Sequence, residues 1–153
     1  MKPEISIAGR RLLMKAVAQA EREAKRDPST FDMREWLRHN PSVKKGAPFC
    51  GTSMCLAGHV LAASGFTPVQ RTYNRWIVPR RVDLRTEAAS LSASMSMSQL
   101  HAEGTPRMAA YLLGVPREDL AQLFMLYNWP QQFRPWTIKN LRPRVMHWLE
   151  TGE

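Results

Sequence analysis

The chain has 153 residues, enough for one domain with a hydrophobic core of its own. Its 22 Lys and Arg residues outnumber the 13 Asp and Glu residues, so the formal net charge is +9, and no apolar run is long enough to cross a bilayer. Two cysteines cannot build a disulfide framework, and the first residues lack the apolar core of a secretion signal, so we expect a cytoplasmic protein.

The positive charge is unevenly distributed along the sequence. Residues 1–45 carry eleven bases and six acids, residues 46–85 carry five bases and one acid, and residues 86–153 carry six of each. A basic first half joined to a neutral second half predicts one positive face. Such a face suits nucleic acid or an acidic protein surface. A basic composition that serves only solubility is the alternative.

The first predicted element is an amphipathic helix over residues 7–26. Its apolar side chains at helical spacing are Leu12, Leu13, Val17 and Ala20. Asp27-Pro28 should end it, because proline cannot continue the hydrogen-bond ladder. Next, Asp32 is placed to cap a short helix that reaches about Arg38. A polar loop over residues 40–48 then exposes Lys44 and Lys45.

The middle of the chain predicts a central helix and a hairpin. Thr52 is a good N-cap for a helix that ends at Gly65, and its small residues favour close burial. Residues 66–79 change to β-forming side chains around a turn, which predicts a small β-hairpin. Residues 86–104 are rich in serine and methionine and suggest a mobile insertion or a weak helix.

The last part of the chain predicts three more helices. One is capped by Thr105 and ends at the Gly114–Pro116 turn. A second follows this turn, carries apolar residues from Leu120 to Tyr127 and ends at Asn128, and the last runs from about Thr137 to Leu149. We therefore expect a single compact, mainly α domain of five to six helices with one small hairpin. Its segments are residues 1–45, 46–65, 66–85, 86–104 and 105–153.

The densest cluster of reactive side chains is Cys50, Cys55 and His59. Cys55 and His59 are four residues apart, so on a helix they share a face. The spacing permits a zinc ion, but a structural zinc needs four ligands, and the fourth would have to be one of the other three histidines. A thiol activated by the helix start at Thr52 is a second possibility. The third, which we favour, is two buried packing thiols, with His59 on the helix surface or in a hydrogen bond.

Two further patterns bear on nucleic acid. Arginines alternate with aromatic residues in the predicted hairpin, an arrangement that can hold phosphates and stack on bases; a solvated hairpin is the alternative. Residues 105–123 have the small residues and turn of a helix-turn-helix. Its second helix would present Glu118 and Asp119 to phosphates, so a plain helical hairpin is favoured.

The chain also resembles a group of small uncharacterised phage and bacterial proteins. The shared pattern begins with Cys50-Gly51-Thr52-x-x-Cys55-Leu56-Ala57-Gly58 and continues with Ala109-Ala110-x-Leu112-Leu113-Gly114-Val115, Leu123-Phe124, Asn128-Trp129-Pro130 and a closing His147-Trp148-Leu149-Glu150-Thr151-Gly152-Glu153. Members often have an aromatic residue at the position of His59. The resemblance implies a helical fold with a small hairpin and transfers no catalytic residue. A phage-encoded member would act in the host cytoplasm.

The function that these observations predict is non-enzymatic binding. The predicted basic face consists of Lys44, Lys45, Arg71, Tyr73, Arg75, Trp76, Arg80 and Arg81. Its partner would be nucleic acid or a nucleic-acid-handling protein complex, and one form is an inhibitor of host defence such as an anti-CRISPR protein. The alternatives are a metal- or thiol-dependent enzyme, with zinc at Cys50, Cys55 and His59, and a helix-turn-helix DNA-binding regulator. No catalytic residue and no other cofactor are expected.

Overall fold

The computed structural model describes the backbone at residues 2–31, 33, 38–39, 52–53, 55–65, 67–70, 74–77, 105–125 and 128–153. At residues 29, 38–39, 52–53, 67–70, 74–77, 105 and 117 it describes the backbone alone. All structural statements below concern these residues.

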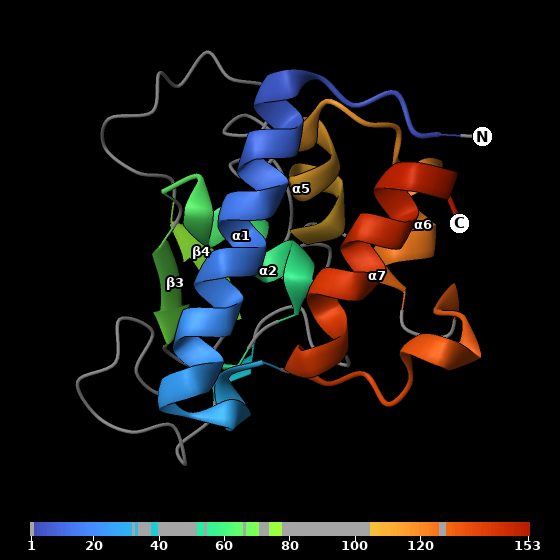
Figure 1. Cartoon of the computed structure of the whole chain (residues 1–153). Coiled ribbons are helices and arrows are strands. Elements are labelled where there is room, and N and C mark those ends of the chain that lie inside the picture. Colours follow the sequence, from blue (N-terminus) through green and yellow to red (C-terminus); the bar gives the residue numbers. More distant parts are fainter. Residues whose placement is uncertain are drawn as a thin grey trace.

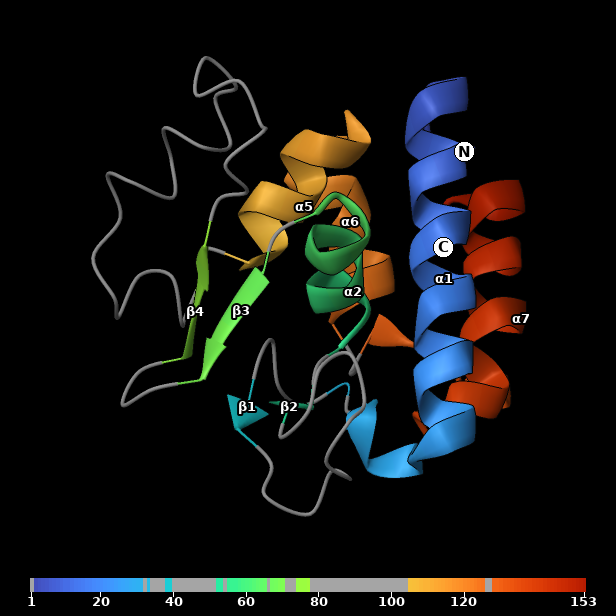
Figure 2. The ribbon, with the colours of Figure 1, turned by 90° about the vertical axis from the view of Figure 1, so that its left-hand side faces the viewer.

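The described part of the chain is mainly helical, which confirms the mainly α part of the predicted fold class. Its α-helices are α1 (Ile7–Arg26), α2 (Leu56–Ala63), α5 (Thr105–Leu113), α6 (Arg117–Phe124) and α7 (Ile138–Thr151), with short 3-10 turns η1 (Pro28–Thr30) and η4 (Gln131–Phe133). Helices α1 and α7 form the front layer in Figure 1, and α2, α5 and α6 lie behind them, as the turned view in Figure 2 shows. None of these helices is both long and apolar enough to span a membrane.

Helix α1 has the bounds that local sequence signals predict. The Ser6 side chain accepts a hydrogen bond from the Gly9 amide at 3.0 Å and so caps the first turn. At the other end, the Asp27 amide donates to the Glu23 carbonyl before Pro28 stops the ladder. Lys25 and Arg26 in the last turn suit the negative end of the helix dipole.

The start of α2 differs from the prediction. Thr52 does not cap a helix; it lies in β2 (Thr52–Ser53), which pairs antiparallel with β1 (Arg38–His39), and α2 begins only after its N-cap Cys55. The prediction that a short helix reaches about Arg38 is also wrong, because Arg38 lies in strand β1. A β-branched threonine fits a strand as well as a cap, and a partner strand decided between the two.

Two other short strands follow α2. Strand β3 (Thr67–Gln70) pairs antiparallel with β4 (Asn74–Ile77), and Val69 is opposite Arg75. The expected basic hairpin over residues 66–79 stays a prediction, because its turn and its side chains lie outside the described residues. The predicted insertion over residues 86–104 lies there too.

The second half of the chain needs two corrections. Helix α6 ends at Phe124 and does not reach residue 127, because the C-cap Met125 is extended and the Asn128 side chain donates to the carbonyl of Ala121. Helix α7 begins near the predicted residue but runs on to Thr151, where Gly152 adopts the left-handed conformation of a helix stop.

A close helix contact sets the position of α1 against α5. A Cβ atom on Gly9 would lie 2.2 Å from the backbone carbonyl oxygen of Leu113, a distance that real Cβ atoms do not adopt. The core around this contact is continuous. It includes Leu13 and Val17 of α1, Leu56 and Leu61 of α2, Met108 and Leu113 of α5, Leu120 and Leu123 of α6, and Val145 and Trp148 of α7.

We expect Gly9→Ala to lower the free energy of unfolding by about 1–3 kcal/mol, because backbone must move to admit the methyl group. A loss of stability would identify the close contact, because a change from glycine to alanine at an ordinary helix position stabilises the protein by roughly 1 kcal/mol. Ala8→Ser, at the exposed neighbouring position, is the control and should change stability by no more than about 0.5 kcal/mol. Urea denaturation measures both. A stabilised Gly9→Ala variant would contradict the contact.

Candidate nucleic-acid interface

Most of the sequence-predicted site lies outside the described residues. This group comprises Lys44, Lys45, Cys50, Arg71, Tyr73, Arg80 and Arg81. Arg75 and Trp76 lie in β4, where only their backbone is described. The hairpin face therefore stays a prediction.

The structure does place Cys55 and His59 on successive turns of α2. The His59 amide donates to the Cys55 carbonyl at 3.1 Å, and both side chains are completely buried. Burial of Cys55 agrees with the packing interpretation, whereas the surface position considered for His59 is wrong. No group of three His, Cys, Asp or Glu side chains suited to a metal ion occurs in the described ranges.

His59 is held between α1 and the segment after η1. Its Nδ1 atom lies 3.2 Å from Nε2 of Gln19, and its ring stacks on Phe31 with centroids 6.3 Å apart. An amide nitrogen can only donate, so Nδ1 accepts and the neutral ring has its proton on Nε2. Nε2 has no hydrogen-bond partner among the described residues. Burial lowers the pKa of His59 to about 3, so the ring is neutral at physiological pH.

Helix α6 is a poor candidate for reading DNA. Its exposed side chains include Glu118, Asp119 and Gln122. Two carboxylates in the first turn would face phosphates if this helix entered a groove, which is electrostatically unfavourable. The geometry of α5 and α6 is better explained by core packing, because Leu120 and Leu123 are buried.

The strongest positive surface among the described side chains is the solvent face of α1. At about 100° per residue, five exposed basic residues of this helix fall within an arc of about 100°. They are Arg11, Lys15, Arg22, Lys25 and Arg26. We call this surface the α1 basic arc. The other α1 residues within it are Ile7, Ala8 and Ala18, so the helix contributes no acidic residue to the arc.

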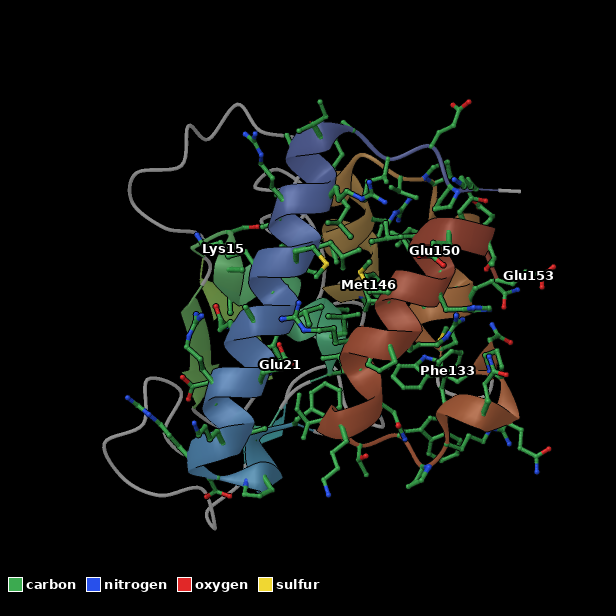
Figure 3. All side chains as sticks on the ribbon, in the orientation of Figure 1. Lys15, Glu21, Phe133, Met146, Glu150 and Glu153 are labelled. Atoms are coloured by element: carbon green, nitrogen blue, oxygen red, sulfur yellow. The ribbon has the colours of Figure 1, made fainter. Side chains whose placement is uncertain are left out.

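The two acidic residues of α1 point away from the arc. Glu23 is buried, and Glu21 lies toward α7, where the Arg142 guanidinium donates to both of its carboxylate oxygens. This hydrogen-bonded partner raises the pKa of Arg142. Figure 3 shows Glu21 on the α7 side of α1 and Lys15 on the opposite side. Glu21 therefore pairs with Arg142 and, among the five residues of the arc, has helical i,i+4 spacing only to Lys25.

Helix stability does not explain this pattern. Like charges four residues apart, such as Arg11 with Lys15 and Arg22 with Arg26, each cost a few tenths of a kcal/mol. Only Lys25 and Arg26 lie in the last turn, where the helix dipole favours cations. An anion bound along the arc would remove the repulsion. The face therefore has the properties of a binding surface for a polyanion.

The sequence-based prediction did not include the α1 basic arc, because the apolar stripe of residues 7–26 indicates only which side of the helix is buried. The signal was present in the sequence: Arg11, Lys15, Arg22 and Arg26 recur at helical spacing, and residues 1–45 hold the largest charge excess. The sequence could not show which part of the helix stays uncovered. Helices α2, α5 and α7 pack against α1 on its other sides, and the basic side chains of the arc, like that of Arg10 outside it, are exposed (Figures 1 and 2).

Comparison with known proteins adds no relative. No family model matches the sequence, and neither a curated protein nor a solved structure is significantly similar to it.

Proposed function

We propose that this is a non-enzymatic protein that binds nucleic acid through the phosphates, with the α1 basic arc as its contact surface. The observation that carries the proposal is the row of Arg11, Lys15, Arg22, Lys25 and Arg26 on one uncovered helix face. From Arg11 to Arg26 the row is about 22 Å long at 1.5 Å per residue. The predicted basic hairpin over residues 66–85 would extend the same chemistry.

A binding role of this kind requires no catalytic residue and no cofactor. It is compatible with the resemblance to phage and bacterial proteins. An inhibitor that occupies the nucleic-acid contacts of a host defence complex is the narrower form of the proposal, in the host cytoplasm. Binding of phosphates is the step that all these forms share, so it is tested first.

Salt dependence tests the proposal. Five phosphate contacts predict a plot of log affinity against log salt with a slope of about −4.5 on a DNA duplex. Replacing Arg11, Lys15 and Arg22 with glutamine should reduce the slope to about −1.8 and weaken binding about 500-fold at about 0.1 M salt. Fluorescence anisotropy with a labelled duplex measures both.

The matched control replaces Lys2, Arg107 and Lys139 with glutamine. These residues are also exposed, and their removal lowers the net charge by the same amount. The control should keep a slope near that of the unchanged protein. Equal losses in the two triple variants would show that net charge, and not the α1 basic arc, is responsible. No binding to any nucleic acid at about 50 mM salt would overturn the proposed function.

A further inference from the structure

The α1 basic arc has no aromatic side chain on which a base could stack. Its uncharged members are Ile7, Ala8 and Ala18. Proteins that hold single strands combine a positive groove with aromatic platforms, and stacking contributes about 1–3 kcal/mol per base. Without such platforms, the arc can recognise phosphates alone, and a flexible strand would lose its main source of affinity.

The arc is also held rigidly. Helix α1 is fixed to α5 by the Gly9 contact, to α2 by the Gln19–His59 hydrogen bond of 3.2 Å, and to α7 by the Glu21–Arg142 pair. The backbone positions that carry its charges are therefore fixed along one face of a straight helix. A stiff partner fits such a row without being ordered first, whereas a flexible strand must give up conformational entropy. A duplex also presents a high charge density, about one charge per 1.7 Å of its axis.

Helix α1 does not stand out from the protein as a ridge. Figure 2 shows α1 and α7 in one layer, and Figure 3 shows Lys15 of the arc on the side of α1 away from α7. Arginines on such a flat face meet the phosphate rims of a duplex and not its base edges, which lie inside the grooves.

We infer that the partner of the α1 basic arc is double-stranded nucleic acid, bound by its phosphate backbone and without regard to base sequence. This inference rests on the proposed function and specifies its substrate class.

The test compares three probes on the full chain at about 50 mM salt, each about 20 base pairs or nucleotides long, roughly three times the length of the arc. They are a DNA duplex, one of its single strands, and a second duplex of unrelated sequence. We expect the first duplex to bind at least about ten-fold more tightly than the single strand, and the two duplexes to agree within about two-fold. The Arg11, Lys15 and Arg22 triple variant should lose most of the duplex preference.

Two results would overturn the inference while leaving the proposed function intact. One is a single strand that binds as tightly as the duplex. The other is a difference of more than about ten-fold between the two duplexes, which would indicate base reading. Failure of all three probes to bind would instead remove the proposed function.

Discussion

Replacing Arg144 with alanine will lower the free energy of unfolding by about 3–5 kcal/mol, the largest effect that we expect from a single substitution. The Arg144 side chain is fully buried. It donates to the carbonyl of Gln122 at 2.5 Å and to the backbone oxygen of Glu153, and its guanidinium carbon lies 6.0 Å from the centroid of the Trp129 ring. Alanine would leave a cavity and would remove the donor to the Gln122 carbonyl and to the exposed backbone oxygen of Glu153.

Two further variants separate the causes. Arg144→Met keeps much of the volume but not the donors, and should cost about 1–3 kcal/mol, the penalty of an unsatisfied buried acceptor. Arg142→Ala removes a guanidinium two residues earlier on the same helix, where the side chain is 44% exposed and paired with Glu21. It should cost about 1 kcal/mol or less. Urea denaturation gives all three values, and equal losses for Arg142→Ala and Arg144→Ala would contradict the buried role of Arg144.

Acid will destabilise the protein through His59. Its pKa is about 3 in the folded state, against 6.5 for an ordinary histidine, because burial disfavours the charged ring. The unfolded chain therefore binds the proton first as the pH falls. The stabilisation is complete above pH 6.5 and is lost progressively between pH 6.5 and about 3. At about 1.4 kcal/mol per pKa unit, the total loss is on the order of 4–5 kcal/mol.

His59→Phe isolates this contribution. Phenylalanine keeps an aromatic ring against Phe31 but cannot take up a proton. Urea denaturation at a series of pH values should show the two proteins diverging as the pH falls below 6.5, with the variant less sensitive to acid. Parallel pH curves would show that His59 is not the group that titrates. The carboxylates common to both proteins cancel in this comparison.

The two stability predictions concern buried residues of α2 and α7, whereas the binding proposal concerns the exposed face of α1. Glutamine at Arg11, Lys15 and Arg22 removes like-charge repulsion and should leave the protein as stable as before or slightly more so. Loss of binding without loss of stability is the result expected of a surface kept for a partner. If these side chains had only a structural role, the glutamine variant would lose stability and keep its binding.

The sequence by itself determined the mainly helical class and the bounds of α1. Ser6 at one end and Asp27-Pro28 at the other act through hydrogen bonds within one turn of the helix, so neighbouring residues suffice to predict them. The charge excess of residues 1–45 follows from the amino-acid composition of that segment alone. It predicted a positive face, and the residues assigned to that face belong to the loop over residues 40–48 and to the expected hairpin, where no side chain is described.

The secondary structure of Thr52 and the burial of His59 and Arg144 were decided only by the tertiary structure, because they depend on residues distant in the chain. Thr52 became a strand residue because His39 lies opposite it, and His59 became a neutral buried group because Gln19 and Phe31 enclose it. Arg144 is buried, and its guanidinium donates to the backbone oxygens of Gln122 and Glu153 and lies over the Trp129 ring. Arg142 on the same helix stays half exposed. Helical spacing arranged the charges of α1 in rows, but which row faces solvent depends on where α2, α5 and α7 pack, and no local signal specifies that.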